Sequence, residues 1–339
     1  MKARLFDFFS CLAIAACLLI WSGCDVDSAT EYLGPMGPAS MSAPNDTGHA
    51  DSTTDWTSTS VPSASIEQTA VAPVDGALTV YFFDVGQGDA TLLAGPNWTI
   101  VIDAGRHNRS DVVPHLQSAG VESIDLLIGT HPHADHIGQF PQILETFPVR
   151  EVWMCGESHS SRTFERALDA ILSSGAAYHE PRAGESYRMG SALIEVLHPV
   201  ELTGNLNESS ICVRVTFGQV SVVLTGDAEA ASERAMIQRG HNLSAQILRL
   251  GHHGSETSST REFLEAVRPE VAIYSAGEGN SYGHPHDVVL QRLARMGIPV
   301  LGTDRHGTIH VQTDGTTYQV TSERGSWMAS APDQPVLVR

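Results

Sequence analysis

One short motif constrains the fold of this 339-residue chain more than any other feature of its sequence: H-P-H-A-D-H, beginning at His131. It follows an apolar stretch, residues 124–129, that predicts a buried strand, and a segment with helical periodicity follows it. Side chains alternate along an extended chain, so His131 and His133 point the same way, while Asp135 and His136 lie at the turn into the helix. Three imidazoles and a carboxylate within six residues are ligands suited to zinc or another divalent cation. The motif therefore predicts a metal centre at the end of a strand.

Two further segments place residues of the same kind after strands. Asp227 follows an apolar strand, where its carboxylate can either cap the next helix or bridge two cations. His252 and His253 stand together between glycines. Because neighbouring residues of an extended turn point to opposite sides, we expect one of the two to bind metal and favour His252, which leaves His253 to meet the substrate or to support a ligand.

Together these segments resemble the metallo-β-lactamase-fold hydrolases, and most of all their ComEC-type branch. Besides H-x-H-x-D-H, the chain carries F-D-V-G-Q-G-D (83–89), D-A-G (103–105), L-T-G-D (224–227), G-H-H-G-S (251–255) and Y-G-H-P (282–285), in the order of that branch. The resemblance covers residues 77–315 and implies an α/β fold, a four-layer αββα sandwich. The branch includes the hydrolase domain attached to bacterial DNA-uptake channels and also free-standing exported proteins. Because no transmembrane run follows its leader, the chain resembles the free-standing form and not the channel.

The resemblance also implies two divalent metal ions, for which zinc is the first expectation and manganese or iron also suit the ligands. A water activated by both ions is the implied nucleophile, with Asp135, Asp227 and His253 as the catalytic residues. In the broader superfamily a further histidine precedes the aspartate strand, whereas this chain has N-E-S-S at residues 207–210, so that ligand comes from elsewhere or is missing. The implied ligands are His131, His133 and His252 on one ion, Asp135, His136 and His284 on the other, and Asp227 between them.

Other polar residues lie close to the same strand ends. Asp84, Asp89 and Asp103 are expected to orient the histidines from behind, although an aspartate beside a glycine, as at Asp89, suits a tight turn almost as well. The residues expected to contact the substrate are Ser255, Asn280 and Tyr282.

Short apolar strands and amphipathic helices alternate through the globular part of the chain, which predicts two sheets packed together with helices outside. The cysteines of this part, Cys155 and Cys212, lie in apolar runs and either pair or remain buried thiols. Strands are predicted at residues 78–83, 90–93, 98–102, 124–129, 193–197, 211–217, 220–224, 247–250, 271–275 and 308–312. Helices are predicted at residues 111–118, 137–146, 163–173, 229–239, 260–267 and 288–296.

The ends of the chain differ in composition from its centre. Residues 1–23 carry an early positive charge, an apolar run and small residues before Cys24, which predicts a signal peptide of the lipoprotein type with lipidation at Cys24. Residues 24–75 are acidic and rich in Ser, Thr and Pro, which predicts a disordered, extended tether. The hydrolase domain is expected at residues 76–323 and a C-terminal tail at residues 324–339. We therefore expect an exported bacterial lipoprotein on a membrane or cell surface, with a periplasmic or secreted protein as the alternative.

Charge narrows the range of partners. The chain has 39 acidic residues against 20 basic ones, a formal net charge of -19, and its single lysine is Lys2. Tight binding of long nucleic acid is not supported, because it requires basic side chains that replace phosphate counterions. We expect a metal-dependent hydrolase that acts on a small or short phosphoester or phosphodiester and meets the membrane only through its lipid anchor. The alternatives are a hydrolase of neutral esters or lactones and a non-catalytic surface accessory protein with a structural metal site.

Overall fold

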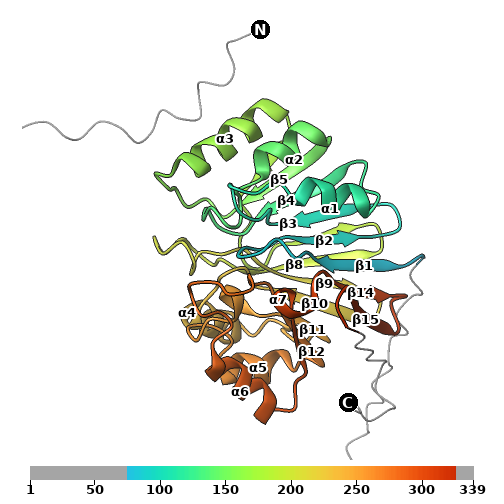
Figure 1. The fold of residues 1–339 in the computed structure, drawn as a ribbon, viewed down its shortest axis with the longest axis vertical. Coiled ribbons are helices and arrows are strands. Elements are labelled where there is room, and N and C mark those ends of the chain that lie inside the picture. Colours follow the sequence, from blue (N-terminus) through green and yellow to red (C-terminus); the bar gives the residue numbers. More distant parts are fainter. Residues whose placement is uncertain (1–74, 326–339) are drawn as a thin grey trace, which may run out of the picture. The chain divides into compact units, whose positions relative to one another are not determined.

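The strands of this chain form two mixed sheets, seen in a computed structural model that describes residues 75–325 (Figure 1). The first sheet contains β1 (Leu78–Phe82), β2 (Thr91–Ala94), β3 (Thr99–Ile102), β4 (Ile124–Gly129), β5 (Val149–Met154), β6 (Ala177–His179), β14 (Ile309–Thr313) and β15 (Tyr318–Ser322). The second sheet contains β7 (Ser186–Met189), β8 (Ala192–His198), β9 (Cys212–Phe217), β10 (Val220–Leu224), β11 (Ile247–Arg249), β12 (Val271–Tyr274) and β13 (Val300–Gly302). Their orders are β15-β14-β1-β2-β3-β4-β5-β6 and β13-β12-β11-β10-β9-β8-β7.

Each sheet has an antiparallel part and a parallel part. In the first sheet β3 to β6 run parallel, and in the second sheet β10 to β13 do so. The registers align the strand ends: Ile102 of β3 pairs with Ile128 of β4, and Leu224 of β10 pairs with Arg249 of β11. Since the carboxyl ends of parallel strands open at one edge of a sheet, the loops that follow β3, β4, β10 and β11 come together there.

Helices cover the outer face of each sheet (Figure 1). Those on the first sheet are α1 (Val112–Ser118), α2 (Phe140–Thr146) and α3 (Arg162–Ser174), and those on the second are α4 (Ala230–Gln238), α5 (Arg261–Val267) and α6 (Asp287–Arg295). Two short helical turns complete the fold, the 3₁₀ turn η1 (Gly251–Gly254) and α7 (Thr303–His306). Side chains set the start of two helices: Ser161 accepts a hydrogen bond from the backbone N–H of Phe164, and Thr260 accepts one from that of Phe263.

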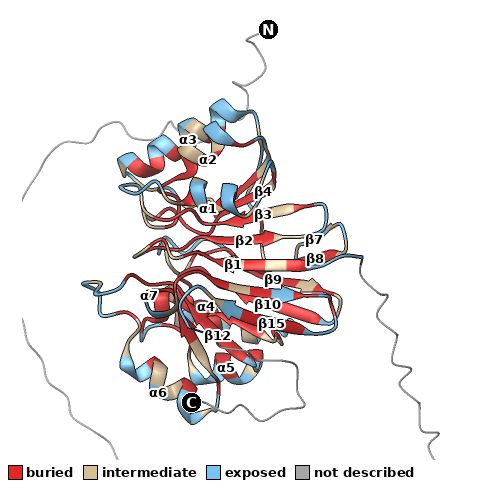
Figure 2. Cartoon of the chain, turned by 45° about the vertical axis from the view of Figure 1, so that its right-hand side comes forward, coloured by how far each residue is buried: buried red, intermediate tan, exposed pale blue. Residues whose placement is uncertain are grey.

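Apolar side chains fill three layers between these elements. Between the sheets, Phe82 of β1 and Val222 of β10 belong to one cluster, because alternate residues of each strand face the other sheet. A second cluster, which includes Phe140, joins the first sheet to its helices, and a third, which includes Phe263 and Leu293, joins the second sheet to its own. Figure 2 shows the same division, with buried residues along the strands and exposed ones on the outward faces of the helices. The predicted four-layer αββα sandwich is confirmed.

The predicted elements are all present, and β4 and β10 have the predicted bounds. The predicted start of α2 at residue 137 is wrong, because the backbone N–H groups of His136 and Ile137 both donate to His133 in a tight turn, and Pro141 occupies the first turn of the helix that follows. Five strands that the sequence did not indicate are β5, β6, β7, β13 and β15. Several of these are short or half exposed, so they lack the apolar period that identifies a strand.

The predicted signal peptide, the lipidation at Cys24 and the tether up to residue 74 lie outside the described residues, as does the tail from residue 326. Within residues 75–325 the structure contains no helix with the length and apolar character that a membrane span requires. Cys155 and Cys212 are both free and buried, so a disulfide between them is excluded. Burial raises the pKa of each thiol, that of Cys155 to about 11, which makes both poor nucleophiles.

Candidate metal centre

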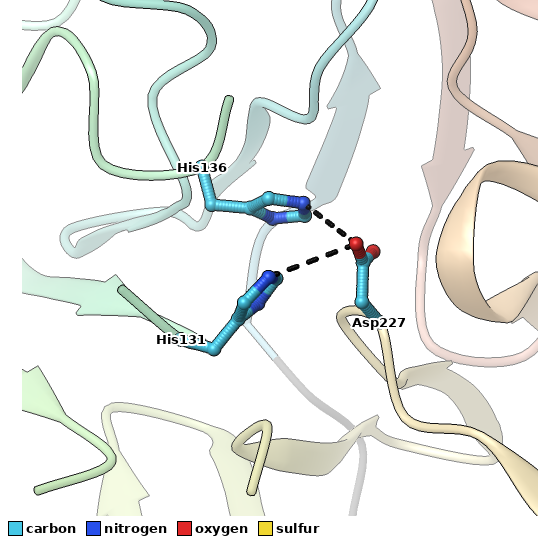
Figure 3. Close-up of side chains that lie close together, drawn as sticks. All are labelled: His131, His136 and Asp227. Carbon is cyan, nitrogen blue, oxygen red and sulfur yellow. Dashed lines mark ion pairs between the residues drawn. The ribbon is translucent and has the colours of Figure 1, made fainter. Parts of the chain in front are cut away.

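Polar side chains gather where the parallel strands of both sheets end. Asp103 follows β3, the H-x-H-x-D-H motif follows β4, Asp227 follows β10, and η1 follows β11. Figure 3 shows His131 and His136 pointing from the first-sheet side toward the carboxylate of Asp227 on the second-sheet side. The fold therefore brings the predicted ligands of two distant segments to one point.

The H-x-H-x-D-H loop forms the first half of the site. His131 Nε2 lies 2.9 Å from His133 Nδ1, within hydrogen-bond distance, so these two nitrogens face each other. His136 Nδ1 donates to Asp103 Oδ2 at 2.7 Å, which turns its Nε2 toward Asp227 Oδ2, 3.2 Å away. Asp103 is fully buried and also accepts a hydrogen bond from the backbone N–H of Thr130 at 2.8 Å. The structure thus places Asp103 behind His136, where its carboxylate fixes the tautomer and the ring orientation.

Asp227 lies at the centre of the site with its two oxygens in different surroundings. Oδ2 faces the imidazoles, with the Nε2 atoms of His136, His253, His131 and His252 at 3.2, 3.6, 3.7 and 3.8 Å. Oδ1 lies 3.8 Å from Arg249 Nη1. The alternative that Asp227 caps the following helix is wrong, because α4 begins at Ala230 and has Glu229 as its N-cap residue.

The two neighbouring histidines of η1 both face the centre. Each has a left-handed backbone, with φ of 48° at His252 and 56° at His253, so the segment is a tight turn and not an extended one. His252 Nδ1 donates to Glu229 Oε1 at 3.0 Å, and His253 Nδ1 donates to the carbonyl of Ser275 at 2.9 Å. Each ring therefore presents Nε2 to Asp227, and the expectation that the pair points to opposite sides is wrong because it assumed extended geometry.

A buried arginine that the sequence analysis missed ties this second half together. Arg249, 1% exposed, pairs through Nη2 with Asp89 Oδ2 at 2.8 Å and donates through Nη1 to the carbonyl of Gly226, next to Asp227. Asp89 Oδ1 accepts from Ser275 Oγ at 2.9 Å. Asp89 thus supports the residues around His253 through Arg249 and Ser275, not by direct contact with a ring. A single basic residue inside the apolar run I-L-R-L was the signal that could have identified Arg249.

His284 lies at the rim. Its ring centroid is 5.4 Å from that of His252 and 6.0 Å from that of His253, and it belongs to none of the tight ligand clusters of the described residues. Asn280 holds its backbone, accepting from the N–H of His284 at 3.1 Å and donating to its carbonyl at 2.6 Å. The amide of Asn280 is thus hydrogen-bonded within its own loop. These bonds favour a role in supporting His284 over the expected contact with substrate. Tyr282, by contrast, is 52% exposed.

Asp84 and Ser255, which are also predicted to belong to the site, have their side chains bonded to other partners. The carboxylate of Asp84 pairs with Arg324 and accepts from the backbone N–H of Gly86 at 3.3 Å, so among residues 75–325 it bonds to none of the histidines that it is expected to orient. Ser255 is buried at 3% exposure, and its hydroxyl bonds Thr257 Oγ1 at 3.0 Å, which removes it from an open substrate surface.

Two further residues of the site, Glu229 and His159, are not evident from the sequence. Glu229 accepts the hydrogen bond of His252, and nothing in its position before a helix distinguished it from an ordinary capping residue. The ring of His159, in the polar loop after β5, lies 6.0 Å from that of His133. At the N-E-S-S stretch, Ser210 Oγ accepts from the backbone N–H of Asp227 at 3.2 Å and lies 3.4 Å from His131 Nδ1.

The electrostatics of the cluster favour a neutral imidazole at His131 and an ionised carboxylate at Asp227. Burial lowers the pKa of His131 well below its usual value, and the charge of His136 adds to this effect. Burial raises the pKa of Asp227, but the imidazoles of His136 and His253 outweigh it and hold that pKa well below the usual range. Burial lowers the pKa of His136, yet the carboxylates of Asp227 and Asp103 raise it overall. Metal ligation requires this combination of carboxylate and unprotonated nitrogen, except at His136, where a cation has to displace the proton.

These residues fit a divalent cation. His136 Nε2, His253 Nε2, Asp227 Oδ1 and His284 Nδ1 are buried with no hydrogen-bond partner among the described residues. Buried polar atoms are rarely left unpaired, because each loses its bonds to water. Among the described residues, three groups of ligand atoms lie within 4.8 Å of one another: His131, His136 and Asp227; Asp135, His136 and His253; and Asp89, Asp103 and His136. A cation coordinated by nitrogen and oxygen would satisfy them.

Comparison with known proteins agrees with this geometry. The chain matches the metallo-beta-lactamase superfamily over residues 83–278, which are 196 of its 339 residues. It is 33% identical to ComE operon protein 3 of Bacillus subtilis (strain 168), over 68% of this chain and 32% of that protein. It is 32% identical to Competence protein ComA of Neisseria gonorrhoeae, over 71% of this chain and 33% of that protein. The chain thus spans about a third of the length of these curated relatives.

A third relative is Recombination protein 2 of Haemophilus influenzae, 31% identical over 67% of this chain and 28% of that protein. Among solved structures, the metallo hydrolase Igni18 of Ignicoccus hospitalis is 16% identical with a TM-score of 0.49, covering 69% of this chain and 98% of that one. The similarity to the competence proteins confirms the ComEC-type resemblance of the motifs. The family match, over more than half of the chain, shows that this protein belongs to the metallo-beta-lactamase superfamily.

Proposed function

We propose that this chain is a metallo-hydrolase that binds two divalent cations and cleaves small or short phosphoesters or phosphodiesters. The observation that carries the proposal is the position of Asp227 Oδ2, which lies 3.2 to 3.8 Å from the Nε2 atoms of four histidines. A carboxylate oxygen surrounded by imidazoles from two separate loops suits a ligand that two cations share.

The proposed ligands are His131, His133 and His252 for the first ion, Asp135, His136 and His253 for the second, and Asp227 for both. This grouping differs from the sequence-based one in a single respect, since His253 takes the place of His284. The Nε2 atom of His253 lies 3.6 Å from Asp135 Oδ2, whereas the ring of His284 lies 6.0 Å from that of His253 at the rim.

Cations bound there would lower the pKa of a water molecule and polarise the scissile bond, with zinc, manganese or iron all suited to the ligands. The chain's own residues hold the histidines ready. Asp103, Glu229 and the carbonyl of Ser275 each accept a hydrogen bond from the Nδ1 of one histidine. Each of these bonds directs the Nε2 atom of its ring at the centre, so the rings need little reorientation when metal binds, and at His136 a cation would displace the proton.

The preference for phosphoesters rests on the ComEC-type resemblance and on similarity to proteins named for competence and recombination. The net charge of -19 opposes tight binding of a long polyanion, because few basic side chains are present to replace its counterions. Short substrates need little electrostatic steering, so they are the class that we propose.

The test is an assay of the purified chain, loaded with zinc or manganese, on bis(p-nitrophenyl) phosphate, p-nitrophenyl phosphate, a lactone and nitrocefin. Phosphodiester or phosphoester turnover that is lost in Asp227→Asn supports the proposal. Turnover of the lactone alone would instead identify a hydrolase of neutral esters. Metal-loaded protein that cleaves none of the substrates would point to the accessory role.

For localisation we propose export and a lipid anchor at Cys24, supported by the apolar run and the small residues before that cysteine. In cells that produce the chain, Cys24→Ser is expected to move the protein from the membrane fraction to the soluble fraction. Unchanged fractionation of this variant would refute the anchor.

A further inference from the structure

Two loops meet at the rim of the metal centre through one hydrogen bond between side chains. Arg106 comes from the loop after β3, and Tyr282 comes from the loop between β12 and α6. Arg106 Nη2 donates to the hydroxyl of Tyr282 at 3.0 Å, across 176 positions of sequence. Only the fold brings these residues together, because they belong to opposite halves of the domain.

Both loops are anchored to the metal centre. Immediately before Arg106, the backbone N–H of Gly105 donates to Asp89 at 2.7 Å, and the carbonyl of Gly105 accepts from Gly138 at 3.0 Å. On the other side, the ring of Tyr282 stacks on that of His284 at 5.7 Å with an interplanar angle of 21°. The guanidinium of Arg106 is therefore held one tyrosine ring away from His284, on the open side of the site.

Arg106 differs from Arg109 and Arg249 because no carboxylate of residues 75–325 neutralises its charge. Arg249 pairs with Asp89 at 2.8 Å. Arg109 pairs with Asp111 at 2.5 Å. Arg106 has no carboxylate partner within residues 75–325, and its hydrogen bond goes to a neutral hydroxyl. A guanidinium has five N–H donors, so most of its donors remain for the oxygens of a ligand.

We propose that Arg106, positioned by Tyr282, binds an anionic oxygen of the substrate and so selects phosphoesters over neutral esters. This inference rests on the proposed function. Hydrogen bonds between a guanidinium and a phosphate are charge-assisted and commonly bidentate, whereas a neutral ester offers this charge no matching partner. The half-exposed ring of Tyr282 keeps the subsite open to solvent, where a substrate can enter.

The test compares Arg106→Gln with Arg109→Gln in the metal-loaded full-length chain. The measured quantities are the KM and kcat for bis(p-nitrophenyl) phosphate, the calorimetric Kd of inorganic phosphate, and the metal content. We expect Arg106→Gln to raise KM and Kd by about 10-fold or more, with kcat and metal content little changed, because it removes charge-assisted bonds made during binding. Arg109→Gln, the matched control, is expected to change neither constant, since Asp111 already neutralises that charge.

Two conservative variants separate the roles of the pair. Arg106→Lys is expected to bind phosphate more tightly than Arg106→Gln and less tightly than wild type. Lysine keeps the positive charge but lacks the planar guanidinium that can donate two parallel hydrogen bonds. Tyr282→Phe is expected to weaken phosphate binding by about threefold, because only the bond that positions Arg106 disappears. KM and Kd within twofold of wild type in Arg106→Gln, or equal losses in Arg109→Gln, would overturn the inference. Absence of phosphodiester turnover in the wild-type chain would instead count against the proposed function, and the phosphate Kd would still measure the role of Arg106.

Discussion

The two halves of the metal centre are built in different ways. The first half comes from one loop after β4, where His131, His133, Asp135 and His136 lie within six residues. The second half is assembled from residues that follow three different strands of the other sheet, β10, β11 and β12. One half is thus a property of a local sequence, and the other is a property of how a sheet aligns its strand ends.

The supports of the halves differ as well. In the first half, the buried carboxylate of Asp103 holds His136 directly at 2.7 Å. In the second half, the carbonyl of Ser275 holds His253, and the pair of Asp89 with Arg249 braces the turn behind it. Asp89 belongs to the first-sheet side of the domain, so the second half depends on a tie between the sheets. This comparison predicts that distant substitutions disturb the second half more readily than the first.

The largest effect is expected where both halves meet. Asp227→Asn removes the charge that faces four imidazoles, and we expect turnover to fall by on the order of a thousandfold, because several kcal/mol of charge stabilisation disappear. Steady-state kinetics and metal content measure the loss. Asp169→Asn, an exposed substitution on α3, is the control and should behave as wild type. Near-normal activity of Asp227→Asn would mean that the halves do not share this ligand.

The second largest effect is expected at the ion pair between Arg249 and Asp89, which ties the two sheets together. Arg249→Met leaves the carboxylate of Asp89 buried and unpaired, so the free energy of unfolding should fall by about 3 kcal/mol. Denaturant unfolding of the metal-free protein measures it. In a double-mutant cycle with Asp89→Asn, the double variant should lose less than the sum of the single variants, because the two side chains contact each other. Additive losses would show that the pair does not brace the second half.

A smaller effect is expected for the carboxylates that accept hydrogen bonds from the histidines, and it should differ between Asp103 and Glu229. Asp103→Asn should weaken metal binding by about 100-fold and Glu229→Gln by about 10-fold, the upper and lower ends of the range typical of partners behind metal-binding histidines. The order follows from burial, since Asp103 is fully buried while water reaches Glu229. Competition with a metal-binding dye measures both affinities. The reverse order would contradict the view that the first half is the more firmly held.

The smallest expected effect is a pH dependence of stability that arises from His284 at the rim of the site. Burial, with the charges of His253 and His252, lowers the pKa of His284 to about 4 in the folded chain, below the usual value of 6.5. The unfolded chain therefore binds more protons between pH 6.5 and 4, so the stability of the metal-free protein falls as pH decreases through that window. Between pH 7 and 5 wild type should lose about 2 kcal/mol more than His284→Gln. Equal losses, measured by urea unfolding at the two pH values, would place His284 in open solvent.

Much of the fold follows from local patterns. β4 and β10 have the predicted bounds, because strands that are buried on both faces carry mostly apolar residues. β7, with a half-exposed and mixed sequence, gives no such signal. At the site, the motif that begins at His131 predicts a cluster of ligands, since its side chains lie within six residues of one another.

The relation between distant residues could not be predicted in this way. His252 and His253 both face Asp227 because their backbone is left-handed, and local sequence did not distinguish this turn from an extended one. Arg249 carried a signal, a charge in an apolar strand, but its partner Asp89 lies in a loop of the other sheet. Such pairings depend on strand order and register, which no short segment specifies.

By itself, then, the sequence determined the ligand types, the first half of the site and the layered α/β fold, because these depend on spacing and periodicity within short segments. The tertiary structure alone decided that Asp227 Oδ2 faces histidines of both halves, that Arg249 and Asp89 tie the sheets together, and that Arg106 meets Tyr282 at the rim. The physical reason is that each of these contacts joins residues whose separation is set by the packing of two sheets, and a buried charge or donor finds its partner only when that packing is complete.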